Sequence, residues 1–197
     1  MPKTKISNPF RPIYPSPAGL IVALDENKKP NVMTAGEVFN ISLKNPCIVG
    51  LALRKATYTH GLICESKEFT VNLPSTAILS QVDLVGSISG RHGLDKFKAY
   101  GLTPIDSDMI TTPIIEECPV NLECKLCSVS EVGDHDLFLG EVVMMHVDSD
   151  KLNGKGSIEI NKVNAFSFAE WGYYKFGEKL EAIGFARRKI KEEDQAD

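Results

Sequence analysis

Short apolar runs separated by polar turns predict a chain built mainly of closely spaced β-strands. The runs with the strongest strand character are GLIVAL at 19–24, CIVGLAL at 47–53 and EFTVNL at 68–73. The second run has no polar alternation, which is typical of a strand buried on both faces. A further run at 31–43 is rich in β-formers but is broken by Ala35-Gly36. A glycine inside a strand pattern predicts a bulge or a close approach of another group to the backbone.

Later runs predict one long hairpin and several short helices. Residues 113–132 and 137–147 read as strands and flank the turn sequence GDHD at 133–136. Capping signals and helical spacing predict helices that begin near Thr57, span 75–86 and span 95–101. Because the strands follow one another closely, the pattern favours a mainly β fold, a β-barrel with peripheral helices, over a doubly wound sheet. We expect a single domain over 1–197, with an N-terminal arm at 1–14 and a charged tail at 185–197.

The composition is that of an ordinary globular protein and narrows the class of partner. With 43% apolar residues among 197, the chain can bury a sizeable core. Its formal net charge of −4 gives no general attraction to nucleic acid or anionic membranes, so any anion site must be local. No apolar run approaches the roughly 20 residues that span a bilayer, and the N-terminus lacks a signal-peptide pattern. We therefore expect a cytoplasmic protein without nucleic-acid or membrane partners.

The five cysteines predict neither a disulfide framework nor a metal centre. Their odd number and the missing export signal argue against disulfides. Cys124 and Cys127 have the spacing of redox and zinc motifs, but they fall in a strand pattern, where positions three apart point to opposite faces. A second pair at ligand spacing is missing as well. Two unrelated strand cysteines and no metal are the prediction; a cysteine-metal protein is the alternative.

The stretch LALRKATYTH at 51–60 carries the clearest candidate chemistry. Arg54 and Lys55 end a buried strand, and the hydroxyls of Thr57 and Thr59 follow at once. Cations, hydroxyls and the free N–H groups of a helix start together suit a phosphate group. For any single cation, a solvated loop is the alternative.

Three other stretches could add to a binding site. GSISGRHGLDK at 86–96 favours anions but matches neither a Walker loop nor a dinucleotide fingerprint, so a plain loop is the alternative. NLPS at 72–75 places an amide and a hydroxyl at a strand end, where helix capping is the alternative. NVMTAGEVF at 31–39 offers an apolar wall with backbone donors and acceptors, which suits the edge of a flat heteroaromatic ring.

In this order and spacing, five stretches resemble the flavin reductase-like FMN-binding family, in particular its flavoredoxin branch. They are NVMTAGEVF, RKATYTH, EFTVNLPS, SGRHGLDKF and GDHDLFLGEV. The resemblance implies a split β-barrel of Greek-key type that binds FMN, usually at the interface of a homodimer. It also implies an oxidoreductase that passes electrons through the flavin, as a flavin or ferric reductase using NAD(P)H or as a flavoredoxin-like protein.

The resemblance also assigns site residues by motif. It implies that the flavin ring lies against Met33, Thr34 and Ala35, beside Asn31, and that Tyr174 covers it. The phosphate would be surrounded from one side by Arg54, Thr57, Tyr58 and Thr59, and closed from the same or the partner subunit by Ser89, Gly90 and Lys96. Asn72 and Ser75 would hold the ribityl chain or the ring edge.

Flavin chemistry requires no side chain as a general acid or base. His135, in the hairpin turn, is the one candidate for a catalytic role, and a plain turn histidine is the alternative. The electron donor is expected to be NAD(P)H or a redox protein. Two alternatives to an enzyme stay open: an electron carrier with permanently bound FMN that a protein partner reduces, and a flavin- or haem-binding module without turnover.

Overall fold

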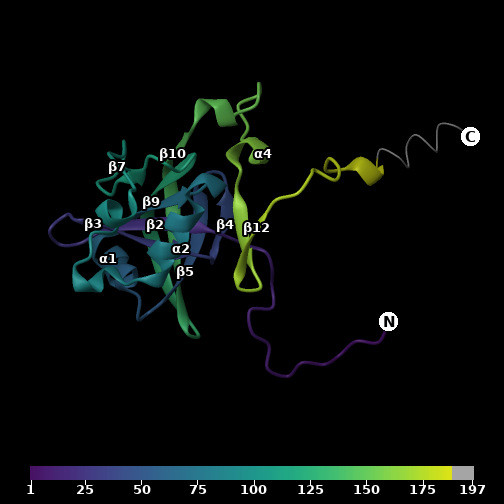
Figure 1. Cartoon of the computed structure of the whole chain (residues 1–197), viewed down its shortest axis with the longest axis horizontal. Coiled ribbons are helices and arrows are strands. Elements are labelled where there is room, and N and C mark those ends of the chain that lie inside the picture. The colour runs from purple at the N-terminus through teal and green to yellow at the C-terminus, as the bar shows by residue number, and fades with distance from the viewer. Residues whose placement is uncertain (188–197) are drawn as a thin grey trace, which may run out of the picture.

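A seven-stranded antiparallel sheet forms the body of the protein in this computed structural model, which describes residues 1–187 (Figure 1). Most of the predicted charged tail, 185–197, lies outside the described residues. The strands, in the order in which they pair, are β3 (Pro30–Ala35), β2 (Gly19–Leu24), β6 (Glu68–Leu73), β9 (Val120–Val132), β10 (His135–Val147), β5 (Cys47–Arg54) and β4 (Val38–Leu43).

The two edge strands of this sheet are consecutive in the chain. Only Gly36 and Glu37 separate the end of β3 from the start of β4. Adjacent Cα atoms lie about 3.8 Å apart, so this connection spans at most about 11 Å. The sheet must therefore curl until its edges approach each other at this corner, while β3 and β4 do not pair with each other. The predicted mainly β fold is confirmed, as a barrel that stays open along a seam between β3 and β4.

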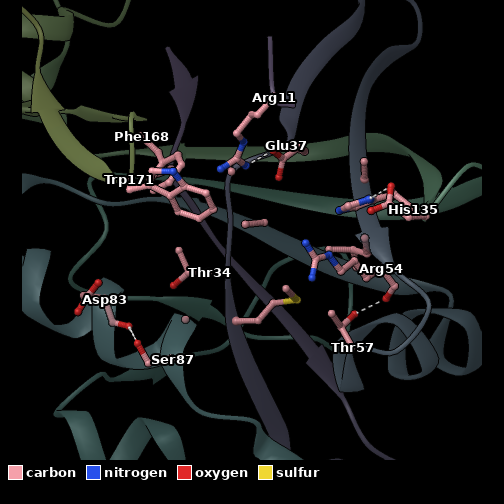
Figure 2. Close-up of a pocket in the computed structure, with 18 of the residues that line it drawn as sticks. Arg11, Thr34, Glu37, Arg54, Thr57, Asp83, Ser87, His135, Phe168 and Trp171 are labelled. Carbon is pink, nitrogen blue, oxygen red and sulfur yellow. Dashed lines mark hydrogen bonds and ion pairs between the residues drawn. The ribbon is translucent and has the colours of Figure 1, made fainter. Parts of the chain in front are cut away.

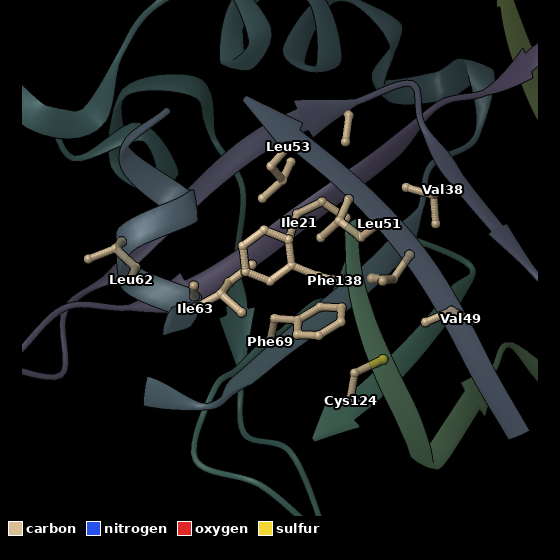
Figure 3. Close-up of a cluster of buried hydrophobic side chains, with 13 residues drawn as sticks. Ile21, Val38, Val49, Leu51, Leu53, Leu62, Ile63, Phe69, Cys124 and Phe138 are labelled. Carbon is tan, nitrogen blue, oxygen red and sulfur yellow. The ribbon is translucent and has the colours of Figure 1, made fainter. Parts of the chain in front are cut away.

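The inside of the barrel is filled by one apolar cluster (Figure 3). Residues that alternate along each strand, such as Val49, Leu51 and Leu53 of β5, point inward because strand side chains have a period of two. Helix α1 (Tyr58–Ser66) adds Leu62 and Ile63 to this cluster. On the other face of β5, Ile48 and Ala52 are only partly buried, so the prediction that 47–53 is buried on both faces holds for part of the strand.

A second apolar cluster lies on the other face of β2, which is the strand buried along its whole length. Its Leu20 and Val22 pack with Val82 and Val85 of α2 (Leu79–Ser87). Further helical elements are η1 (Thr76–Ile78), η2 (Gly90–His92), α3 (Lys96–Tyr100), η3 (Ser149–Lys151) and α4 (Ile160–Val163). The predicted helix at 75–86 is thus a 3₁₀ turn that runs into an α-helix ending at Ser87.

Two small sheets complete the fold. One consists of β1 (Ser16–Pro17), β11 (Phe166–Ala169) and β12 (Gly172–Lys175), and Figure 1 shows this β11–β12 hairpin beside the barrel. The other pairs β7 (Pro104–Ile105) with β8 (Ile114–Ile115). The pattern analysis assigned no strands to 166–175. No helix of the described residues is long and apolar enough to cross a membrane.

The predicted long hairpin is present with a tighter turn. β9 and β10 are separated by Gly133 and Asp134 alone, and Gly133 has a φ of 60°. The predicted first strand, 113–132, is divided into β8 and β9 by residues 116–119. The hairpin therefore extends as far as His135, which places this histidine on a strand end beside Arg54 of β5.

Candidate functional site

A pocket of about 820 Å³ lies at the seam of the barrel (Figure 2). Its floor comes from the end of β3 and the end of β5, and α2 forms one side. Its remaining wall comes from the N-terminal arm and the β11–β12 hairpin. A volume of this size is typical of small-molecule and cofactor sites, which span about 300–1,000 Å³.

The β3 wall contains three predicted site residues, Met33, Thr34 and Ala35. The Thr34 hydroxyl donates a hydrogen bond of 2.6 Å to the Val82 carbonyl of α2. This hydroxyl is thereby used to hold the helix against the strand. Because β3 is an edge strand, alternate backbone N–H and C=O groups along it have no strand partner. The β3 wall can therefore offer a ligand an apolar side chain, Met33, together with backbone groups.

The end of β5 supplies a cation to the pocket. Arg54 and Thr57 both line it, and the Thr57 hydroxyl donates to the Arg54 carbonyl at 2.9 Å. Thr57 is the N-cap of α1, yet its side chain makes no capping hydrogen bond to the helix. The first N–H groups of α1 are therefore not satisfied by this cap, and the helix dipole adds partial positive charge there. Arg91 comes close as well, donating to the Ala56 carbonyl at 3.1 Å.

The second cation of the RK pair points elsewhere. The Lys55 ammonium lies 2.7 Å from Glu131 and 3.6 Å from Asp136, on the hairpin. The hydrogen bond with Glu131 is the main cause that raises the pKa of Lys55 above its usual range. Of the two adjacent cations, only Arg54 lines the pocket.

Asn31, Thr59 and Gly90 lie together behind the pocket. The Asn31 amide donates to the Thr59 hydroxyl at 2.8 Å, and both side chains are buried. A Cβ at Gly90 would collide with the side-chain amide oxygen of Asn31 and lie 3.6 Å from the Tyr58 side chain. Glycine is thus required for the η2 turn to approach β3 and α1. These four predicted residues are neighbours, but none of them lines the pocket in this chain.

The wall formed by the N-terminal arm and the β11–β12 hairpin was missed by the pattern analysis. Phe10 stacks on Trp171 with centroids 5.8 Å apart, and the Arg11 guanidinium lies 4.5 Å from the centroid of the Phe168 ring. Arg11 also pairs with Glu37. Trp171 is 76% exposed and lines the pocket. The density of aromatic residues in FSFAEWGYYKF was the available signal.

An acidic side of the pocket lies on α2. Asp83 accepts hydrogen bonds from the Tyr173 hydroxyl at 3.0 Å, across the pocket rim. Burial and this hydrogen bond raise the pKa of Tyr173 to about 12. Tyr173 therefore stays protonated across the physiological range. Tyr174, which the family resemblance placed over a flavin, instead points its hydroxyl toward Glu170 and does not line the pocket.

His135 lines the pocket at the end of β10. Its Nδ1 lies 2.8 Å from the carboxylate of Asp134, and this hydrogen bond lowers the pKa of Asp134. Figure 2 shows the ring on the same side of the pocket as Arg54. The structure thus places the predicted candidate at the site, next to the cation of β5.

Four other predicted residues have structural partners away from the pocket. Asn72 is fully buried, donates to the Leu20 carbonyl and accepts from the Ile115 N–H, so it joins β2, β6 and β8. Ser75 and Ser89 accept hydrogen bonds from the N–H groups two residues later and cap η1 and η2. Lys96 donates to the carbonyls of Val32 and Val85, both at 2.9 Å, and thereby joins β3 to α2.

Lys96 predicts a pH-dependent stability. Burial lowers its pKa from 10.5 to about 8. Between these values the unfolded chain binds more protons at Lys96 than the folded chain does, so the free energy of unfolding rises with pH through this window. The contribution of a neutral, buried Lys96 to the free energy of unfolding is fully present above pH 10.5 and is lost as the pH falls to about 8. In urea unfolding, the free energy of unfolding of the wild type should rise relative to that of Lys96→Met between about pH 7.5 and about pH 10. A constant difference would contradict a buried ammonium.

A group of one histidine and two carboxylates lies outside the pocket, with one member on β9, one on β10 and one in the loop at 106–112. Nitrogen and oxygen ligand atoms of Asp108, Glu123 and His146 lie within 4.8 Å of one another. Glu123 already accepts from His146 at 2.6 Å and from the N–H groups of Asp108 and Met109. Burial alone would raise the pKa of Glu123, but these hydrogen bonds hold it below its usual range. The group thereby ties the loop at 106–112 to the sheet.

The two cysteines at redox-motif spacing lie on one strand, β9. Cys124 is fully buried in the barrel and Cys127 is exposed. Their positions agree with the opposite faces that a strand predicts.

Comparison with known families shows which protein family this chain belongs to. The model of the flavin reductase like domain matches residues 11–162. The chain belongs to the flavin reductase-like family. The predicted split β-barrel is confirmed, with its seam between β3 and β4.

Several proteins resemble this chain over most of its length. Flavoredoxin of Desulfovibrio vulgaris (Miyazaki F) is 33% identical, with a TM-score of 0.85 over 94% of this chain and 100% of that chain. A flavin reductase of Pseudomonas putida is 31% identical over 70% of this chain and 76% of its own length. The NADH:riboflavin 5′-phosphate oxidoreductase of Streptomyces pristinaespiralis is 30% identical over 65% and 69% respectively.

Proposed function

We propose that this protein binds FMN in the seam pocket and passes electrons through it as an NAD(P)H-dependent oxidoreductase. The observation that carries the proposal is the pocket's two-part chemistry. One end has an apolar edge strand, and the other has Arg54, the Thr57 hydroxyl and the N-terminus of α1. A flavin mononucleotide combines a flat ring with a phosphomonoester dianion, and these two parts suit the two ends.

The residues fit the cofactor, and each has a separate task. Arg54 and the first N–H groups of α1 would hold the phosphate, while Met33 and the β3 backbone would lie along the ring. FMN would supply the hydride and electron transfer, and the protein would set orientation and access. One relative's name specifies riboflavin 5′-phosphate and NADH, which supports FMN and a nicotinamide donor.

The test is an absorbance spectrum of the purified protein before and after adding FMN or FAD. NADH and then NADPH are added under anaerobic conditions. Flavin bands that travel with the protein on gel filtration and bleach with a nicotinamide are the expected result. If neither flavin stays with the protein, the proposal fails. Retention of FAD but not FMN would overturn the choice of cofactor.

An electron carrier is the second candidate, and the similarity to a flavoredoxin favours it. Such a protein would keep its FMN and take electrons from a redox partner. The same spectra distinguish the two functions. Flavin bands that persist with both nicotinamides but bleach with dithionite would identify the carrier.

We also propose that the chain forms a homodimer. Apolar side chains are exposed on the N-terminal arm, on the edge strand β4 and on the chain that follows β12. They include Ile6, Ile13, Phe39, Leu43, Leu180 and Ile183. Exposed apolar groups of this extent typically mark protein interfaces. Light scattering should give twice the mass of one chain, and a monomer at micromolar concentration would contradict the proposal.

A further inference from the structure

Three side chains form a relay on the far side of β10 from the pocket. Cys64 and His60 lie one helical turn apart on α1, and Asp136 is the second residue of β10. Successive residues of a strand point to opposite sides. While His135 lines the pocket, its neighbour Asp136 therefore faces α1.

The distances order the relay. His60 Nε2 lies 2.8 Å from Asp136 Oδ2, and His60 Nδ1 lies 3.9 Å from the sulfur of Cys64. A carboxylate only accepts hydrogen bonds, so the neutral imidazole carries its proton on Nε2 and donates it to Asp136. Nδ1 then presents a lone pair toward the thiol. A nucleophile, a base within reach and a third group that orients the base are the parts of an activated nucleophile.

Asp136, the carboxylate behind His60, is buried and has few partners. Asp136 has a side chain only 7% exposed, and its Oδ1 has no hydrogen-bond partner among the described residues. The nearest cation is the Lys55 ammonium, 3.6 Å away, and Lys55 is itself shared with Glu131. Leaving a buried carboxylate without partners is costly, so the hydrogen bond between Asp136 and His60 holds the imidazole firmly in this orientation.

The ring of His60 is held in place, and Cys64 beside it is partly exposed. Phe138 meets His60 edge-on, with centroids 4.9 Å apart and planes at 88°. The His60 side chain is 16% exposed, and Cys64 is partly buried. Cys118 and Cys124 differ, because they are buried and burial raises the pKa of both thiols. Partly exposed thiols beside a base are the reactive kind, whereas buried ones are inert.

We propose that Cys64 is a modification site that reacts with small electrophiles, hydrogen peroxide in particular, after passing its proton to His60. The sulfur of Cys64 attacks one oxygen of the peroxide and loses two electrons. The O–O bond breaks, a sulfenic acid forms on Cys64, and the leaving hydroxide takes the proton from His60 Nδ1 to become water. Asp136 acts as a positioning residue that holds the imidazole in the required tautomer.

The test compares cysteines within one molecule. The full-length protein, with its cysteines reduced and without nicotinamide, is treated with iodoacetamide, and mass spectrometry of peptides follows each cysteine over time. The exposed Cys127 is the internal reference. An ordinary thiol has a pKa of about 8.5, so near pH 6.5 only about 1% is thiolate. We expect Cys64 to react about tenfold faster than Cys127 there.

Two variants identify the base. His60→Gln keeps a donor for Asp136 but removes the base, and Asp136→Asn removes the charge behind it. Each should slow Cys64 severalfold at low pH, shift its rate profile toward that of Cys127 and leave Cys127 unchanged. Circular dichroism checks that each variant folds. If one variant does not fold, the other is sufficient for the test.

Peroxide supplies the second readout. Dimedone, which labels sulfenic acids, should mark Cys64 before Cys127, and Cys64→Ser should lose the label. The proposal is overturned if wild-type Cys64 is slower than Cys127 near pH 6.5 or shares its pH profile. It is also overturned if folded variants leave the rate of Cys64 unchanged. None of these outcomes depends on whether the pocket binds FMN.

Discussion

Arg54→Ala should raise the dissociation constant for FMN about 10- to 100-fold, because a hydrogen bond to a charged group contributes about 1.5–3 kcal/mol. Arg54 is the cation of the RK pair that lines the pocket, and it lies beside the uncapped start of α1. Quenching of flavin fluorescence during titration of the flavin-free protein measures the constant directly.

Lys55→Ala is the matched control for this prediction. Lys55 is the next residue, yet it pairs with Glu131 instead of lining the pocket. Its replacement should leave FMN affinity within about twofold, since this exposed ion pair is screened by solvent and lies outside the site. Riboflavin, which has no phosphate, should bind wild type and Arg54→Ala equally. An equal loss for riboflavin and FMN would show that Arg54 does not bind the phosphate.

Phe69→Ala should lower the free energy of unfolding by about 3–5 kcal/mol, the usual cost of emptying a buried phenyl site. Phe69 is fully buried inside the barrel (Figure 3). It fills the space in front of Gly140. A Cβ at Gly140 would overlap the tip of the Phe69 ring and lie 2.8 Å from its Cε1. Gly140→Ala alone should therefore cost about 1–3 kcal/mol through overpacking.

The double variant tests whether the two residues share one space. In Phe69→Ala the obstructing ring is gone, so adding Gly140→Ala should cost little or restore some stability. The summed single effects should exceed the double effect by about 1 kcal/mol or more in urea unfolding. Gly154→Ala is the control, because nothing lies within 4 Å of a Cβ there, and it should change stability by less than about 0.5 kcal/mol. Additive effects would contradict the packing argument.

Local patterns predicted the strands and part of the site, because both depend on short-range rules. β2 and β6 begin and end where apolar runs meet turn residues, and the interruption at Ala35-Gly36 became the corner between the barrel edges. Met33, Arg54 and Thr57 converge on one pocket although the sequence separates the first two widely. Their residue types indicated a ring wall and an anion end, and the family resemblance supplied the expectation that they meet.

Other residues could not be assigned because their partners are distant in the chain. Asn72 lies at a strand end, and its amide would be free to bind a ligand if only the local sequence were considered. In the fold, the N–H of Ile115 in β8, 43 residues away, donates a hydrogen bond to it. Lys96 likewise has the chemistry of an anion ligand, but its ammonium group donates hydrogen bonds to two backbone carbonyls. Side-chain type indicates what a residue can bind, whereas tertiary packing decides what it does bind.

The β11–β12 hairpin escaped the pattern analysis for a different reason. Its turn residues, Glu170 and Trp171, both adopt positive φ, at 49° and 65°. Two-residue hairpin turns usually place Asn, Asp or Gly at such positions, so turn rules gave no signal here. Positive φ at a bulky residue costs free energy and often occurs at functional sites.

The position of this hairpin has an evolutionary consequence. The match to the family model ends at residue 162, whereas the hairpin that carries Phe168, Trp171 and Tyr173 begins at Phe166. It is hydrogen-bonded to β1 and not to the barrel strands. Mutations in the hairpin can change the shape of one wall of the pocket without breaking hydrogen bonds between the strands of the barrel. A barrel of this kind can therefore change which molecules it admits through a few substitutions in ten residues of chain.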